Sequence, residues 1–234
     1  MARKKDLSVS KKIVETARDI HGTIMKKKSP TVVTPIRSLR NVKYHAKAGY
    51  FQLLGKNKMR KLTVGTVKTF AQTLKMMSLS KELIDSDDIA TKREAYYISK
   101  NWDKAGFSEQ SESDTIMDDV EAMFRVNREQ LKFTPEEKGG DIAGKLIVID
   151  KDSSGKPLKI DCTKFGSGAY SVPTDVEELK FQSKAKFILA IETAGMFQRL
   201  VKYDYWKKAN CILISMGGVP TRACRRFIRR LCDQ

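Results

Sequence analysis

Arg93 and Tyr97 place a guanidinium and a phenol one helical turn apart. The apolar spacing over residues 91–102 predicts a helix, and at 100° per residue Tyr97 falls on its cationic face. A phenol in that position can attack a phosphodiester while the guanidinium holds the phosphate oxygens. The competing interpretation is a surface tyrosine that stacks on its neighbours.

The opposite face of this helix is expected to be buried. Its apolar seam consists of Ala95, Ile98 and Trp102. Tyr96 lies to one side of the seam, where partial burial is expected. Tyr97 is therefore the better candidate of the two adjacent tyrosines, on a face that it shares with Arg93, Lys100, Asn101 and Lys104.

Glu192 is a candidate metal ligand because it ends an apolar strand predicted over 186–192. Functional groups of α/β sheets gather at the carboxyl ends of strands. Mg²⁺ prefers oxygen ligands and keeps several of its waters. The alternative is a carboxylate satisfied by the N-terminus of the following helix. A single carboxylate is a weak metal site.

Five arginines lie on a helix predicted over 221–232. They form one face of that helix, opposite an apolar face: Arg222, Arg225, Arg226, Arg229 and Arg230. Two interpretations stay open, a solvated helix face and a contact with phosphate or an acidic protein.

The glycine-rich segment 139–146 nearly matches a phosphate-binding loop, but two features argue against nucleotide binding there. Leu146 replaces the hydroxyl residue that would bind Mg²⁺. Lys145 opens a strand instead of a helix, so no helix N-terminus faces a phosphate. We interpret the segment as a glycine-rich turn.

The first quarter of the chain supplies basic elements. A basic amphipathic helix is expected over 8–27, and its stripe favours docking on the body or a partner over lying on a membrane surface. Short strands and turns are expected over 31–64. Their basic residues are interleaved with aromatic ones, which fits a solvated basic face and a phosphate-contacting one equally well.

Three helices and a β-hairpin are predicted next. The helices are expected over 66–79, 91–102 and 113–124. Ser113 or Asp114 is the expected N-cap of the third helix. The hairpin follows over 145–162. Helices followed by a hairpin wing are typical of a winged-helix DNA-binding module.

The last part of the chain reads as two strand–helix units. The apolar strands over 186–192 and 209–215 are each followed by a helix. This order implies a parallel sheet covered by helices. Two parallel strands alone make a poor sheet, so this half looks cut short or completed by something else.

The charge of the chain indicates a polyanionic partner. Its 234 residues carry a formal net charge of +17, and residues 1–68 hold 18 Lys and Arg against 3 Asp and Glu. A basic arm on a near-neutral body suits nucleic acid. No apolar run approaches the ~18 residues of a membrane span, and no signal-peptide core is present. The four cysteines lack zinc-binding spacing, so we expect reduced thiols in an intracellular, soluble protein.

Four segments carry a family resemblance in one order along the chain. Arg93-Glu-Ala-Tyr-Tyr97 fits the pattern R-[DE]-x-[FY]-Y, and Glu137-Lys-Gly-Gly-Asp-Ile-Ala-Gly144 contains a Lys-Gly turn. Ile188-Leu-Ala-Ile-Glu-Thr-Ala-Gly-Met-Phe197 and Gly218-Val-Pro-Thr-Arg222 follow. From about residue 63 to the end, the chain resembles the A subunit of archaeal type IIB DNA topoisomerase (topoisomerase VI), a relative of the meiotic double-strand-break protein.

The resemblance implies an α+β fold with an α/β part. We expect a basic helix and arm over 1–63, a winged-helix (CAP-like) domain over 64–170 and the first part of a Toprim domain over 171–234. It further implies that Tyr97 is the nucleophile that forms a 5′-phosphotyrosyl link and that Arg93 stabilises charge on the phosphoryl oxygens.

The resemblance also implies ligands and partners. Glu192 would bind Mg²⁺, and DNA contacts would come from Lys138, Lys100 and Arg222. The protein partners would be a second copy of this chain and a separate ATPase B subunit, joined in an A₂B₂ heterotetramer that acts on double-stranded DNA. The protein would work in the cytoplasm on nucleoid DNA, without a membrane.

One departure from the family concerns the metal site. The later Asp-x-Asp that completes the Toprim site has no counterpart after Glu192. We therefore expect that the isolated chain binds DNA but cleaves it poorly or not at all. The alternative is a non-catalytic winged-helix DNA-binding or scaffolding protein, which would not need Arg93, Tyr97 and Glu192 together.

Overall fold

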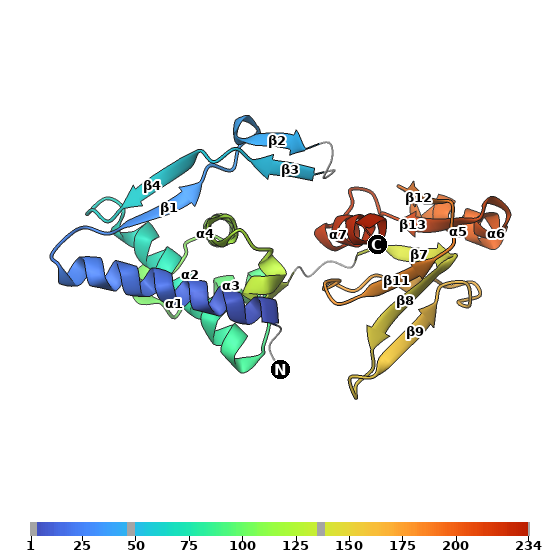
Figure 1. The fold of residues 1–234 in the computed structure, drawn as a ribbon, viewed down its shortest axis with the longest axis horizontal. Helices are drawn as coiled ribbons and strands as arrows, with labels where there is room; N and C mark the ends of the chain where they lie inside the picture. Colours follow the sequence, from blue (N-terminus) through green and yellow to red (C-terminus); the bar gives the residue numbers. More distant parts are fainter. Residues whose placement is uncertain (1–3, 46–49, 135–138, 234) are drawn as a thin grey trace. The chain divides into compact units, whose positions relative to one another are not determined.

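The computed structural model describes residues 4–45, 50–134 and 139–233, which form two compact units dividing between Thr134 and Pro135 (Figure 1). Each unit has a buried core of its own. This division lies elsewhere than the boundaries near 63 and 170 expected from the sequence. The basic N-terminal helix and arm belong to the helical unit, and the expected wing belongs to the second unit.

Helices dominate the first unit. They are α1 (Lys4–Met25), α2 (Val67–Ser86), α3 (Lys92–Ser99) and α4 (Gln110–Phe124), with 3-10 helices at Leu39–Asn41, Asp103–Ala105 and Arg128–Leu131. The strands pair as β1 (Thr31–Pro35) with β4 (Asn57–Lys61), β2 (Val42–His45) with β3 (Tyr50–Leu53), and β5 (Ala90–Thr91) with β6 (Phe133–Thr134). The β5–β6 pair is parallel and the other two are antiparallel.

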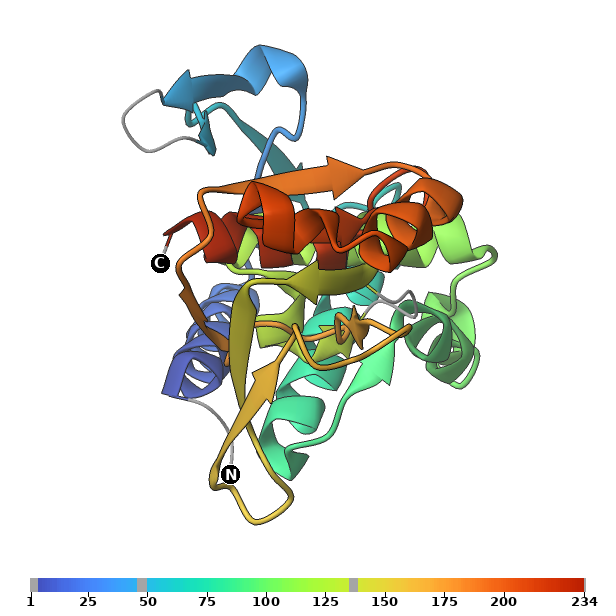
Figure 2. The same cartoon turned by 90° about the vertical axis from the view of Figure 1, so that its right-hand side faces the viewer.

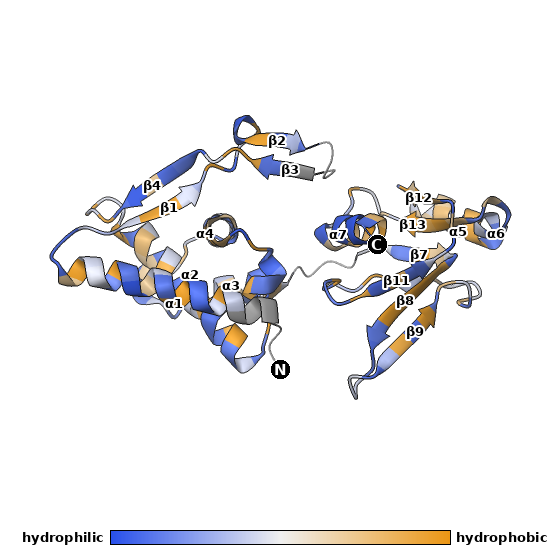
Figure 3. Cartoon of the chain, viewed as in Figure 1, coloured by the Kyte–Doolittle hydropathy of each residue, from blue (hydrophilic) through white to orange (hydrophobic). Residues whose placement is uncertain are grey.

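The apolar stripe of α1 docks on its own unit. Val9 and Ile13 are buried in the main core of this unit, together with Met76 of α2. Ile20 joins a smaller cluster with Phe70. Figure 3 shows apolar and polar positions alternating along α1, as the helical period requires. Docking against the body, one of the two arrangements expected for this helix, is thereby confirmed.

Helix α4 begins earlier than the sequence predicts. Its N-cap is Glu109, and Ser113, which we expected to cap the helix, is buried within it. The early start follows from Glu112, whose carboxylate accepts a hydrogen bond from the Ser108 amide at 2.8 Å and so closes the first turn. The second expected cap, Asp114, instead binds Lys92 of α3.

The second unit combines two sheets with helices. The four-stranded sheet has the order β10 (Tyr170–Ser171), β7 (Asp141–Gly144), β13 (Cys211–Ser215), β12 (Phe187–Ile191). The three-stranded sheet has the order β11 (Lys180–Ser183), β8 (Leu146–Lys151), β9 (Pro157–Asp161). The helices are α5 (Ala194–Lys202), α6 (Tyr205–Ala209) and α7 (Arg222–Asp233). Figure 2 shows the β8–β9 hairpin, in yellow and orange, extending away from α7.

Strand β13 is buried along its whole length between two helical layers. Ile212 and Ile214 pack in one cluster with Phe227 of α7, whereas Leu213 lies in another with Phe197 of α5. This pattern explains its continuous apolar run. β12 and β13 are parallel, as predicted.

The sheet is completed from a segment that we misread. Residues 139–146, interpreted as a turn, contain β7, which pairs antiparallel with β13. Ile142 and Ala143 of β7 are both buried, so the short strand contributes to the core on each face. Strands β7 and β10 therefore extend the sheet beyond the two parallel strands, in line with the expectation that something else in the chain completes it.

The predicted hairpin forms but is not a wing of the helical unit. β8 pairs with β9 and also with β11. Leu146 and Val148 are buried in the core of the second unit beside Ile212. A winged-helix assignment of the first unit thus cannot depend on this hairpin.

None of the helices in the described residues is long and apolar enough to cross a membrane. The cysteines are free thiols, of which Cys162, Cys211 and Cys224 are buried and Cys232 is exposed. Burial raises the pKa of the Cys162 thiol to about 12.

Candidate active site

A capping box fixes the start of α3. The Thr91 hydroxyl accepts a hydrogen bond from the Glu94 amide at 3.1 Å, and the Glu94 carboxylate accepts one from the Thr91 amide at 2.6 Å. Thr91 also pairs with Thr134 across the parallel β5–β6 ladder. The Lys92 Nζ atom lies 2.6 Å from Asp114 Oδ2 on α4. Strand, cap and ion pair together hold the orientation of α3.

Tyr97 projects from this helix with Arg93 on the same side. The Tyr97 side chain is 56% exposed, and Arg93, one turn earlier, is exposed as well. Within the described residues neither side chain is engaged in a hydrogen bond or an ion pair. The structure thus brings together an accessible phenol and an accessible guanidinium, the pair predicted to act on a phosphodiester.

Tyr96 has a different environment from its neighbour. Its hydroxyl donates a hydrogen bond to the Ser108 carbonyl at 3.1 Å. The Lys100 Nζ atom lies 4.3 Å from the centroid of the Tyr96 ring and donates to the Phe107 carbonyl at 2.6 Å. These contacts confirm the partial burial expected for Tyr96. They also hold the Lys100 ammonium, predicted to contact DNA, against the 107–108 loop, a contact that the sequence did not predict.

The buried seam of α3 differs from the predicted one at Ile98. This side chain is 37% exposed, while Ser99 is fully buried. α3 ends at Ser99, and Trp102, which follows in a turn, still packs against the core. The Ser99 hydroxyl donates to the Tyr96 carbonyl at 2.5 Å and accepts from the Phe107 amide at 3.4 Å.

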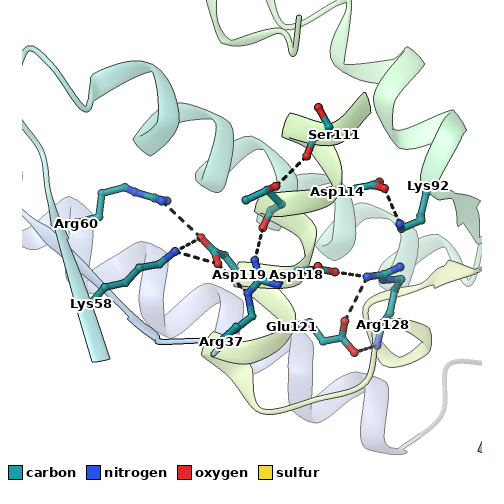
Figure 4. A network of polar contacts seen from close by, with 11 residues as sticks. Arg37, Lys58, Arg60, Lys92, Ser111, Asp114, Asp118, Asp119, Glu121 and Arg128 are labelled. Carbon is teal, nitrogen blue, oxygen red and sulfur yellow. Dashed lines mark hydrogen bonds and ion pairs between the residues drawn. The ribbon is translucent and has the colours of Figure 1, made fainter. Parts of the chain in front are cut away.

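Several basic residues of 31–64 are neutralised inside the first unit (Figure 4). Asp119 of α4 is 2% exposed and pairs with Arg37, Lys58 and Arg60 at 3.1, 2.9 and 3.5 Å. Arg37 also pairs with Asp118 at 3.0 Å. The sequence left open a solvated basic face and a phosphate-contacting face for this region. The side chains of Arg37, Lys58 and Arg60 fit neither interpretation. The available signal was the Asp118-Asp119 pair on a helix otherwise expected to pack by its apolar face.

Glu192 follows β12 at the carboxyl edge of the four-stranded sheet and is exposed. Its carbonyl accepts a hydrogen bond from the Gly218 amide at 2.8 Å, which places the loop after β13 beside it. Thr193 is the N-cap of α5, so the alternative in which the N-terminus of this helix satisfies the Glu192 carboxylate also remains open. No group of three His, Cys, Asp or Glu in the described ranges is arranged to hold a metal ion. Glu192 alone therefore does not make a magnesium site.

The remaining predicted residues are distributed over the chain. Arg222 begins α7 in the second unit, and Lys138 lies outside the described residues. The α7 arginines serve packing more than expected, since Arg226 pairs with Glu177 at 2.6 Å and Arg230 donates to the Leu179 carbonyl at 2.9 Å. The structure brings Arg93 and Tyr97 together on α3, with Lys100 as the C-cap that follows it, whereas Glu192 and Arg222 belong to the other unit.

Comparisons with known proteins cover both units. Residues 68–133 match a family model described as type IIB DNA topoisomerase. Residues 136–185 match the all-beta domain in DNA topoisomerase VI alpha subunit, and residues 187–234 match the Toprim domain shared by the topoisomerase 6 A subunit with Spo11. The three matches follow one another along the chain in the order of the sequence motifs.

Individual relatives extend the match to the N-terminal arm. The A subunit of type 2 DNA topoisomerase 6 from Methanocaldococcus jannaschii is 48% identical over 232 residues, covering 99% of this chain and 63% of the relative. That of Methanosarcina mazei is 33% identical, covering 99% and 64%. That of Pyrococcus abyssi is 34% identical, covering 95% and 58%. The chain thus spans less than two thirds of the length of these relatives, and over that span it belongs to the family of type IIB DNA topoisomerase A subunits.

Proposed function

We propose that this chain carries the DNA-binding and strand-cleaving part of an ATP-dependent type IIB topoisomerase, with Tyr97 as the nucleophile. The observation that carries the proposal is the exposed Arg93–Tyr97 pair on a helix whose start is fixed by a capping box. Membership of the family supports it.

The proposed reaction is a transesterification at a DNA backbone phosphate. The Tyr97 phenol oxygen attacks phosphorus, the bond to the 3′ oxygen breaks, and the phenol proton ends on that 3′ oxygen. The product is a 5′-phosphotyrosyl link, which stores the energy of the broken bond so that the reverse attack reseals the strand. Arg93 holds the non-bridging oxygens, where negative charge grows in the transition state.

Lys138, Lys100 and Arg222 are proposed to contact the DNA backbone. Because the Lys100 ammonium donates to the Phe107 carbonyl, it would have to exchange this hydrogen bond for a phosphate. Glu192 enters the proposal as a single carboxylate ligand of Mg²⁺, an ion that would offset charge on the phosphate. No step of the reaction above depends on that ion.

The proposed winged-helix character of the first unit rests on its own elements. α2, α3 and α4 pack around one core, and the β1–β4 pair is held to α4 by the Asp119 ion pairs. The proposed partners are double-stranded DNA, a second copy of this chain and an ATPase B subunit, in an A₂B₂ assembly. The relatives are named as A subunits, which supports the existence of a B subunit.

The test is capture of the covalent adduct. The chain is combined with the segment of the M. jannaschii relative that lies outside the match, with a B subunit, Mg²⁺, ATP and supercoiled plasmid. Denaturation with detergent should then trap protein-linked breaks. Tyr97→Phe should abolish the adduct, whereas the matched variant Tyr96→Phe, which loses only the hydrogen bond to Ser108, should retain it. An adduct formed by Tyr97→Phe refutes the assignment.

The alternative function is DNA binding without cleavage. The absence of a three-ligand metal cluster among the described residues favours it for the chain acting alone. In that case Tyr97→Phe would leave every measured property unchanged, while DNA affinity would still fall steeply with salt. The detergent-trapped adduct distinguishes the two functions, because DNA affinity and its salt dependence in gel-shift titrations are expected from both.

A further inference from the structure

A groove of about 700 Å³ opens in the second unit at the end of the sheet opposite Glu192. It lies between β8, β11 and α6. The Lys145 amide at its edge donates to the Cys211 carbonyl, at the amino end of β13. Glu192 instead follows the carboxyl end of β12, which runs parallel to β13. The groove is therefore separate from the edge where the metal ligand is proposed.

Trp206 forms an apolar wall of this groove and is held from behind. Gly144, at φ +109°, allows α6 to lie directly on β7, because an added Cβ there would come within 2.7 Å of the Cys211 carbonyl oxygen and 2.9 Å of Trp206 Cβ. Trp206 packs against the cluster around Leu213 and Phe197 but is only partly buried, and it lines the groove. An indole packed from one side and partly exposed is a surface on which a planar group can stack.

Three lysines line the same groove as Trp206: Lys145, Lys184 and Lys207. The backbone of two of them is held by hydrogen bonds, since the Lys145 carbonyl accepts from the Ser183 hydroxyl at 2.5 Å and the Lys184 carbonyl accepts from Asn210 at 3.3 Å. Within the described residues their ammonium groups form no ion pair. They are thus available to an anionic ligand.

The one carboxylate that lines the groove does not cancel this charge. Asp161 accepts hydrogen bonds from the Thr163 hydroxyl at 2.7 Å and the Thr163 amide at 3.0 Å, and it lies 3.5 Å from the Lys164 ammonium. Its charge is therefore met by the turn in which it lies. The groove remains cationic, with hydroxyl and amide groups of Thr163, Ser183 and Gln182 along it.

We propose that this groove binds a nucleotide unit, with the base stacked on Trp206 and the phosphate held by Lys145, Lys184 and Lys207. The volume falls within the range of small-molecule sites, and an aromatic wall beside lysines is complementary to a planar base joined to a phosphate. The unit can come from a free nucleotide or from an unpaired nucleotide of single-stranded DNA. The site does not use the phosphate-loop geometry rejected for residues 139–146, because Lys145 joins two strands and precedes no helix.

The proposal is independent of strand cleavage, since it involves neither Tyr97 nor Glu192. Its test uses the full chain with Trp102→Phe, so that Trp206 is the remaining tryptophan of the sequence. AMP, ATP, an eight-residue oligo(dT) and an oligoglutamate peptide are titrated separately, and tryptophan quenching is recorded. Calorimetry on the chain with both tryptophans repeats each titration without relying on the Trp102→Phe background.

We expect saturable quenching by the free nucleotides AMP and ATP, by oligo(dT), or by all of them. The titrant that binds identifies the source of the nucleotide. For oligo(dT), three phosphate contacts predict a slope of log K against log salt of about −2. The double variant Lys184→Glu/Lys207→Glu should weaken binding about tenfold or more. The matched control Lys186→Glu/Lys208→Glu changes the charge equally outside the groove and should stay within about twofold.

Three results would overturn the proposal. The first is the absence of quenching and of heat with every nucleotide and oligonucleotide, and the second is binding of the oligoglutamate peptide alone, which would indicate an acidic protein as the ligand. The third is equal weakening by the groove variant and its matched control, which would show a diffuse electrostatic effect. Tyr97→Phe should leave the titrations unchanged, so failure here and failure of the cleavage proposal are distinguishable.

Discussion

Replacing Asp119 by asparagine should destabilise the first unit strongly, although the side chain keeps its shape. The carboxylate is almost fully buried on α4 and is the shared partner of three cations that arrive from β4 and from the segment between β1 and β2. The variant removes the negative charge and leaves Arg37, Lys58 and Arg60 facing a neutral amide. These ion pairs hold the β1–β4 strand pair against the helices (Figure 4).

The size of the effect follows from the exposure of the partners. Removing one member of a buried ion pair costs about 3–5 kcal/mol, whereas an exposed pair is worth about 0.2–1 kcal/mol. Lys58 and Arg37 are 43% and 35% exposed, and Arg60 is 20% exposed, so water replaces part of the lost interaction. We therefore expect a loss of about 2–3 kcal/mol in the free energy of unfolding.

Urea unfolding followed by tryptophan fluorescence measures this loss. Trp102 packs against the core of the first unit, and Trp206 packs in the second. In a Trp206→Phe background the fluorescence reports the first unit alone. With a urea dependence of about 2 kcal/mol per molar, the midpoint should fall by about 1 M.

The matched control is Asp85→Asn. Asp85 is 53% exposed and pairs with Lys81 one turn earlier on α2, so its loss should cost about 0.5 kcal/mol or less. If Asp119→Asn shifts the midpoint no further than Asp85→Asn, the reasoning fails. The three cations would then be solvated charges that happen to lie near a carboxylate, and not a desolvated network.

Three further predictions concern the second unit. Gly144→Ala should destabilise it by about 1–3 kcal/mol more than Gly155→Ala, because both glycines have positive φ but only Gly144 is crowded. Urea unfolding followed by Trp206 fluorescence in a Trp102→Phe background measures the difference. Equal losses of stability would contradict the crowding argument. At pH 8, iodoacetamide should alkylate the exposed Cys232 rapidly and spare Cys162, because a pKa of about 12 keeps the buried Cys162 thiol protonated. Peptide mass spectrometry locates the label. Rapid labelling of Cys162 would refute the burial argument. The Thr163 hydroxyl holds the pKa of Asp161 below its usual range. This carboxylate therefore stabilises its turn above pH ~4, and the stabilisation is lost as the pH falls through the folded-state pKa. Thr163→Val should raise the Asp161 pKa, and an unchanged NMR titration of Asp161 would show that the hydroxyl is not the cause.

The local periodicity of the sequence predicted much of the fold and part of the candidate site. The exposed position of Tyr97 and the partial burial of Tyr96 follow from 3.6 residues per turn, which the chain obeys as long as α3 persists. The prediction fails at Ile98, which is exposed, whereas Ser99 beside it is buried. The Ser99 hydroxyl accepts a hydrogen bond from the Phe107 amide, a contact with a later segment that no helical wheel contains.

Contacts between segments that are distant along the chain could not be predicted from the sequence. Lys58 and Asp119 are 61 residues apart, and nothing local to either residue indicates its partner. Strand β7 is four residues long and ends at a glycine, so its composition resembles a turn, and only pairing with β13 makes it a strand. The hairpin β8–β9 was correctly predicted from its turn and flanking strands, but its place in the second unit depends on β11 and on the core around Ile212.

The position of β13 has a consequence for how the second unit is made on the ribosome. This strand lies in the middle of the four-stranded sheet but comes after the other three described strands along the chain. Until Cys211–Ser215 emerges, β7 and β12 have no strand between them, and each exposes an unpaired edge and an apolar face. Pairing of β7 and β12 with β13 therefore has to wait until all three strands have been made, and nascent chains halted before that step present unpaired edges of the kind that chaperones bind and that promote aggregation.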